Sequence, residues 1–162
     1  LSPGEELSEF VLSKYTSRFR TEVLPTIRAV SGARDLIATL KLQGAKVALA
    51  TACSRDERDR YRACLGADEY IDAAVCGDDV RRAKPHPDII TEALKRLGCA
   101  PGEAVYVGDT PYDAEAARQA HVRSFGVLSG HFPRADLLAA GCSAIFLDPK
   151  SMNHALAAPQ AA

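Results

Sequence analysis

The chain has 162 residues, and its 20 basic and 21 acidic side chains give a formal net charge of −1. This balance argues against a nucleic-acid-binding surface, which needs a basic surplus, and no apolar run approaches the ~18–20 residues of a membrane span. With 47% hydrophobic and 25% charged residues, the composition is that of one globular domain. The five cysteines form no CxxC pair, which indicates free thiols of a reducing cytoplasm and neither disulfides nor a zinc site.

Helix and strand patterns alternate along most of the chain. A capping-box pattern at 2–5 predicts a helix to about Arg20, and Pro25 interrupts a second short helical stretch. Further helices are predicted at 33–42, 54–66, 88–97, 111–120 and 134–140, with a weak one near Met152 and a frayed tail at 157–162. Short apolar strands are predicted at 47–50, 73–76, 104–107, 124–127 and 144–147.

This alternation predicts the α/β class with a doubly wound, Rossmann-like parallel sheet, because crossover helices join parallel strands. Residues 1–30 carry helical patterns without strands, so we expect a separate helical piece there. The α/β core is expected to cover residues 31–162. In such sheets ligands bind beyond the carboxyl ends of the strands, and candidate site residues are therefore sought directly after each strand.

Two carboxylates follow the strand at 104–107. Asp109 comes directly after the strand and Gly108, and Asp113 lies one helical turn later. Converging carboxylates at a strand end suit Mg²⁺, which prefers oxygen ligands. The alternative interpretation is that Thr110 and Asp113 only form a helix-capping pair.

Thr51 and Lys84 are candidates for binding an anion. Thr51 ends the strand at 47–50 and precedes backbone N–H groups at a helix start, although Thr51 and Ser54 could also serve only as helix caps. Lys84 lies in a loop stiffened by Pro85 and Pro87 and could hold a fixed charge against phosphate, or be simply solvated.

Taken together, three segments resemble the haloacid dehalogenase-like hydrolase superfamily, in particular its phosphoglycolate-phosphatase-like branch. They are Val-Ala-Leu-Ala-Thr at 47–51, Lys-Pro-His-Pro-Asp at 84–88, and Val-Tyr-Val-Gly-Asp-Thr-Pro-Tyr-Asp-Ala-Glu-Ala-Ala at 105–117. The resemblance extends over roughly residues 20–150. It implies a Mg²⁺-dependent phosphomonoesterase of small phosphorylated metabolites that works through an aspartyl-phosphate.

The resemblance also implies roles for individual residues. Asp109 would bind Mg²⁺, and Asp113 would bind it directly or through water. Thr51 and the N–H of Ala52 would hold the phosphoryl group, and Lys84 would neutralise its charge. Thr51 and Lys84 are thus the expected catalytic residues of this chain.

The family's first motif, Asp-x-Asp after an apolar strand, is missing: none of the twelve aspartates has another two positions away. Residue 1 is Leu, and the only methionine is Met152. We therefore expect an N-terminally truncated hydrolase in which residues 1–30 are the end of a helical cap. The absent strand would lie between those bearing Thr51 and Asp109, so its loss predicts two unpaired inner edges and poor stability.

Two other functions fit the sequence. One is a catalytically inactive domain that binds phosphate or a partner, and the other is a sugar phosphomutase of the same family. The sequence defines neither the substrate nor the oligomeric state. The loop with Asp78 and Asp79 is expected to be only solvated, and the mixed run at 55–62 is expected to be a helix face of interleaved opposite charges.

Overall fold

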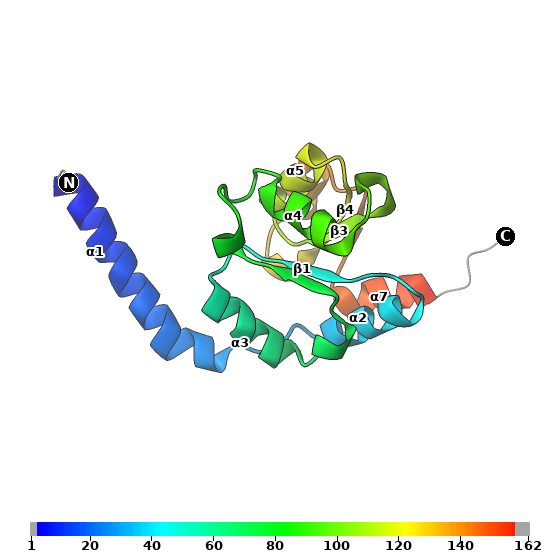
Figure 1. The fold of residues 1–162 in the computed structure, drawn as a ribbon, viewed down its shortest axis with the longest axis horizontal. Helices are drawn as coiled ribbons and strands as arrows, with labels where there is room; N and C mark the ends of the chain where they lie inside the picture. The colour runs from blue at the N-terminus through cyan, green and yellow to red at the C-terminus, as the bar shows by residue number, and fades with distance from the viewer. Residues whose placement is uncertain (1–2, 158–162) are drawn as a thin grey trace.

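The computed structural model describes residues 3–157 and has the predicted α/β architecture (Figure 1). All strand pairs in this range are parallel. The strands are β1 (Ala48–Ala50), β2 (Ala73–Val75), β3 (Val105–Gly108), β4 (Arg123–Val127) and β5 (Ala144–Phe146). The α-helices are α1 (Pro3–Arg18), α2 (Ala33–Leu42), α3 (Arg55–Leu65), α4 (Asp88–Leu97), α5 (Pro111–Gln119), α6 (Arg134–Ala140) and α7 (Pro149–Ala157).

Within residues 3–157 the strands form two separate sheets instead of one. β1 pairs with β2, aligning Ala48 with Ala73, while β3, β4 and β5 form the second sheet in that order. One edge of β1 and one edge of β3 therefore have no strand partner in the described part of the chain. These are the two inner edges at which the absence of the first motif predicts a missing strand.

Helices pack on both faces of the strands. Figure 1 shows α2, α3 and α7 on the opposite side of β1 from α4 and α5. The largest apolar cluster combines α4 and α5 residues with residues from both sheets; its buried members are Val75, Ile89, Ile90, Ala93, Leu94, Ala116, Ala117, Ala120 and Val122. This shared core holds the two sheets together on one face, since apolar burial is the main stabilising term.

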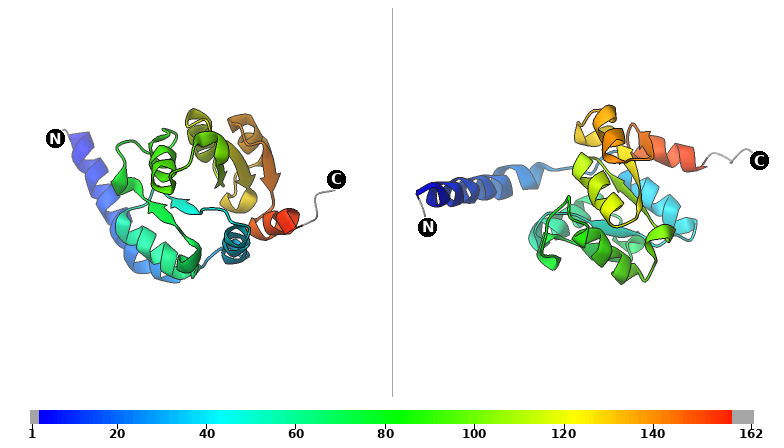
Figure 2. Two further views of the ribbon diagram at one scale, coloured as in Figure 1. Left: turned by 45° about the vertical axis from the view of Figure 1, so that its right-hand side comes forward. Right: turned by 90° about the horizontal axis from the view of Figure 1, so that it is seen from above.

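The N-terminal helix α1 projects away from the α/β body (Figures 1 and 2). Its side chains Phe10, Leu12 and Tyr15 are more than half exposed, although large apolar groups usually seek a covering surface. After Arg18 the helix continues as a π-helical turn (Phe19–Val23) and a 3₁₀ turn (Leu24–Thr26) around the predicted break at Pro25. Residue 2 of the predicted capping box and residues 158–162 of the predicted tail lie outside the described residues.

Local signals in the sequence fix most element boundaries. Ser54 begins α3 with the predicted capping box, since its side chain accepts from Glu57 N–H and Glu57 accepts from Ser54 N–H. Gly66 ends that helix in the left-handed conformation that a glycine adopts without strain. The capping role proposed for Ser54 is thereby confirmed.

Candidate active site

The turn after β3 brings two aspartates together. Gly108 leaves no room for a side chain, because a Cβ there would lie 2.3 Å from the Cβ of Asp113. Thr110 caps α5, and Oδ2 of Asp113 accepts hydrogen bonds from Thr110 N (3.0 Å), Thr110 Oγ1 (2.8 Å) and Asp109 N (3.2 Å). Thr110 and Asp113 thus form the alternative capping pair, and that pair fixes the Asp113 carboxylate beside the backbone of Asp109.

Lys84 meets Asp113 from the other side of the site. Its Nζ lies 2.6 Å from Asp113 Oδ1 and 3.2 Å from the hydroxyl of Tyr106, and the side chains of Lys84 and Asp113 are only 16% and 5% exposed. The interpretation of Lys84 as a solvated loop residue is therefore wrong. A partly desolvated ammonium at this position is a fixed positive charge.

Thr51 directly follows β1, and its N–H donates to Val75 O at 3.1 Å. Its hydroxyl makes a local turn contact, 3.3 Å from Cys53 Sγ, and no hydrogen bond within residues 3–157 joins it to Lys84, Asp109 or Asp113. The loop after Thr51 nevertheless shares a cavity of about 300 Å³ with Lys84, a volume that suits a small ligand. Its walls are Ala52, Cys53, Ser54, Gly77, Asp78, Val80, Arg81, Ala83, Lys84 and Ile89.

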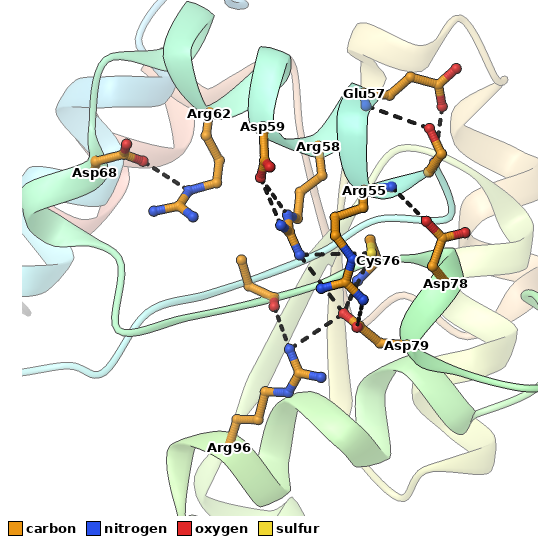
Figure 3. Close-up of polar contacts among 12 residues, drawn as sticks. Arg55, Glu57, Arg58, Asp59, Arg62, Asp68, Cys76, Asp78, Asp79 and Arg96 are labelled. Atoms are coloured by element: carbon orange, nitrogen blue, oxygen red, sulfur yellow. Dashed lines mark hydrogen bonds and ion pairs between the residues drawn. The ribbon is translucent and has the colours of Figure 1, made fainter.

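The loop that leads to Lys84 is anchored by Asp79 (Figure 3). This side chain is only 7% exposed, and its carboxylate accepts from Cys76 N at 3.0 Å, Arg55 Nη2 at 2.7 Å and Arg96 Nη1 at 3.3 Å. Arg58 lies 3.9 Å away. The expectation of a solvated loop is therefore wrong for Asp79, which ties this loop to α3 and α4.

A second set of contacts joins the same loop to the Thr51 turn. Gly77 N–H donates to Cys53 O at 2.8 Å, and Asp78 accepts from Arg55 N at 2.8 Å, at the first turn of α3. A Cβ on Gly77 would lie 2.7 Å from Ala52 O, so only glycine allows this approach. The two walls of the cavity are thereby held at a fixed separation.

The two aspartates are electrostatically distinct. Burial, reinforced by the charge of Asp113, raises the pKa of Asp109. Burial also acts to raise the pKa of Asp113, but the charge and hydrogen bond of Lys84, with hydrogen bonds from Thr110 and Tyr106, outweigh it and lower the pKa. Asp113 is thus a well-supported anion, whereas at Asp109 the charge of Lys84 acts to lower the pKa but does not outweigh burial and the charge of Asp113.

These residues fit a divalent cation only as part of a larger ligand set. No group of three or more His, Cys, Asp or Glu side chains placed to hold a metal occurs in the described part of the chain. Asp109 is the carboxylate that would gain most from a cation, while both oxygens of Asp113 already accept hydrogen bonds. Mg²⁺ commonly takes one or two protein carboxylates and completes its shell with water and substrate phosphate, so this donor set is compatible with it.

The structure therefore brings Lys84, Asp109 and Asp113 together and places Ala52 on the same cavity as Lys84. Sequence reasoning missed Tyr106, whose hydroxyl lies 3.1 Å from Asp113 Oδ1 and 3.2 Å from Ala50 O. Burial, with the charge and hydrogen bond of Asp113, raises its pKa well above the ordinary value, so the phenol stays protonated. The available signal was a tyrosine between two valines in an otherwise apolar strand.

Comparison with known proteins identifies the family. Residues 2–127 match the model of the haloacid dehalogenase-like hydrolase family. The chain belongs to this family. It is similar to a hydrolase from Pseudomonas syringae, with 30% identity, a TM-score of 0.85, and coverage of 93% of this chain and 72% of that protein.

Two further relatives carry more specific names. Pyrophosphatase PpaX from Bacillus velezensis is 36% identical over 88 residues, which are 54% of this chain and 41% of that protein. CbbY from Rhodobacter sphaeroides, solved with phosphate, is 31% identical with a TM-score of 0.68, and the match covers 76% of this chain and 55% of CbbY. A variant of CbbY has been solved with xylulose-(1,5)bisphosphate.

The match spans less than half the length of the curated pyrophosphatase. The resemblance is therefore to part of that protein. Among the described residues of this haloacid dehalogenase-like chain, no helix is both long and apolar enough to cross a membrane.

Proposed function

We propose that this chain carries the phosphate- and cation-binding part of a cytoplasmic, Mg²⁺-dependent phosphatase of small phosphorylated metabolites. The observation that carries the proposal is the Lys84–Asp113 pair, 2.6 Å apart beside the cavity that Lys84 shares with Ala52. A fixed ammonium and the backbone N–H groups after β1 are donors suited to phosphate oxygens. The phosphate-bound CbbY and the name of the pyrophosphatase support this substrate class.

In this proposal each residue of the chain has a task. Lys84 neutralises charge on the phosphoryl oxygens, and Thr51 and the N–H of Ala52 hold those oxygens at the end of β1. Asp109 holds Mg²⁺, which offsets the repulsion between an attacking carboxylate and the phosphate. Asp113 would bind the cation directly or through water, and its hydrogen bonds orient Lys84 and the Asp109 backbone.

The attacking carboxylate would come from an Asp-x-Asp segment that these 162 residues do not contain. We propose that this segment pairs with the open edges of β1 and β3, and that residues 1–30 are part of a helical cap. The phosphoglycolate-phosphatase-like branch remains our assignment within the family. The five described cysteines are all free thiols, which supports a reducing compartment.

The test is a chimera in which an N-terminal segment with the Asp-x-Asp motif, taken from a haloacid dehalogenase-like hydrolase, precedes this chain. With Mg²⁺, we expect the chimera to release orthophosphate from small phosphomonoesters or pyrophosphate. Lys84→Met should abolish the release, while Arg62→Gln, on the far end of α3, should retain it.

Other outcomes decide between the alternatives. A folded chimera without turnover would favour an inactive phosphate- or partner-binding domain. Isomerisation of a sugar phosphate without release of orthophosphate would favour a phosphomutase.

A further inference from the structure

Tyr106 links parts of the molecule that belong to different sheets. Its backbone lies in β3, and its hydroxyl reaches Ala50 O in β1 at 3.2 Å. The same hydroxyl contacts Asp113 Oδ1 on α5 at 3.1 Å and Lys84 Nζ, from the loop after β2, at 3.2 Å. One oxygen atom thus meets three groups from three segments of the chain.

The carbonyl of Ala50 faces the open edge of β1. Peptide groups point alternately to the two sides of a strand, and Thr51 N–H is directed to β2 through Val75 O. The carbonyl of Ala50 belongs to the same peptide group and therefore points away from β2, toward β3. In the described residues no strand pairs with β1 on this side. The phenol supplies a hydrogen-bond donor at this position, which matters because unpaired buried carbonyls are unfavourable.

The hydrogen-bonding capacity of a phenol fits this set of contacts. A phenol has one proton and can also accept, so it receives a hydrogen bond from Lys84 and donates to either Asp113 or Ala50. The Lys84 ammonium has three N–H donors, of which two are used by Tyr106 and Asp113. Among residues 3–157 no acceptor takes the third, which can therefore serve a ligand.

We propose that Tyr106 is a positioning residue of this site: its hydroxyl fixes Lys84 and Asp113 relative to the end of β1, so that Lys84 is already oriented when a phosphate group enters the cavity. This inference rests on the proposed function, because it requires phosphate to bind beside Lys84. Preorganised donors bind more tightly because less side-chain freedom is lost on binding.

The test compares Tyr106→Phe with a matched control, Tyr70→Phe, in the 162-residue chain. Tyr70 lies after α3, and its ring contact with Arg34 survives loss of the hydroxyl. Orthophosphate is titrated in EDTA and again with Mg²⁺, well below the melting temperature, and binding is followed by the amide resonances of Thr51 and Ala52. Lys84→Met serves as the reference for complete loss of the ammonium.

We expect Tyr106→Phe to weaken orthophosphate binding about tenfold, the scale of one hydrogen bond to a charged group, while Tyr70→Phe binds like the unmodified chain. A purely structural role would lower the melting temperature and leave the dissociation constant of the folded protein unchanged, and that result overturns the proposal.

Two results would instead contradict the proposed function. They are failure of the unmodified chain to bind orthophosphate, and unchanged binding by Lys84→Met. Binding that is sensitive to Lys84 and insensitive to Tyr106 overturns the role of Tyr106 alone.

Discussion

Asp109 is the residue at which function and stability are most directly opposed. Its carboxylate is partly buried near Asp113 and has a raised pKa, so the folded state disfavours its charged form. The folded protein therefore holds this proton to higher pH than the unfolded chain does. Stability falls as the pH rises through this interval and stays lower at neutral pH.

We accordingly predict that Asp109→Asn raises the melting temperature at neutral pH in EDTA. The expected gain is about 2 °C, corresponding to less than 1 kcal/mol, and it should vanish in acid, where the aspartate is protonated in both states. Asp136→Asn, at an exposed position in the first turn of α6, is the control and should give no gain in melting temperature. A lower melting temperature for Asp109→Asn would contradict the conclusion that burial and the charge of Asp113 make the Asp109 carboxylate unfavourable in the folded state.

A second prediction for Asp109 concerns cation binding. Addition of Mg²⁺ should raise the melting temperature of the unmodified chain, because a ligand that binds only the folded state stabilises it. Asp109→Asn should lose most of this increase, and thermal melts across a Mg²⁺ series measure it. An equal increase in both proteins would show that the cation binds elsewhere.

At the scale of elements, the loop from Gly77 to Lys84 depends on Asp79. The hydrogen bond from Cys76 N–H, helped by Arg96, lowers the pKa of Asp79 from 3.8 to about 2. A lowered pKa means that Asp79 stabilises the fold above its ordinary titration range. This contribution is lost as the pH falls from 3.8 toward 2.

We predict that Asp79→Asn lowers the free energy of unfolding by about 2 kcal/mol at neutral pH, because three arginines lose their shared partner. Urea denaturation measures the difference, which should shrink as the pH falls below 4. Asp68→Asn, which breaks the exposed pair with Arg62 at the other end of α3, should cost less than about 0.5 kcal/mol. Equal losses in the two variants would rule out a special role for Asp79.

The elements themselves could be predicted closely because their signals are local. The predicted helices at 33–42, 88–97 and 134–140 have the observed boundaries, set by apolar spacing and terminal glycines. The burial of Asp79 could not be predicted, since its partner Arg96 lies 17 residues away. Tyr106 reaches Ala50 across 56 residues, and only the fold reveals such a contact.

At the scale of the whole molecule, the divided sheet governs stability. Unpaired edges of β1 and β3 are sites for association between chains. We predict that the isolated chain melts broadly and at a temperature that depends on concentration, while the chimera with the upstream segment melts sharply and higher. Calorimetry at several concentrations tests this, and a sharp, reversible, concentration-independent melt of the isolated chain would contradict it.

The site lies across the break between the two sheets. Lys84 follows β2 and Asp113 lies on α5 after β3, so their ion pair and the Tyr106–Ala50 hydrogen bond both join one half of the molecule to the other. These contacts join the two halves beside the apolar packing of α4 and α5, the packing of α2 against α7, and the hydrogen bond from Gln119 to Pro85 O. Weakening the Lys84–Asp113 ion pair or the Tyr106–Ala50 hydrogen bond should allow the two halves to open independently. Amide hydrogen exchange in β1 and β2 should then become faster than in β3 to β5.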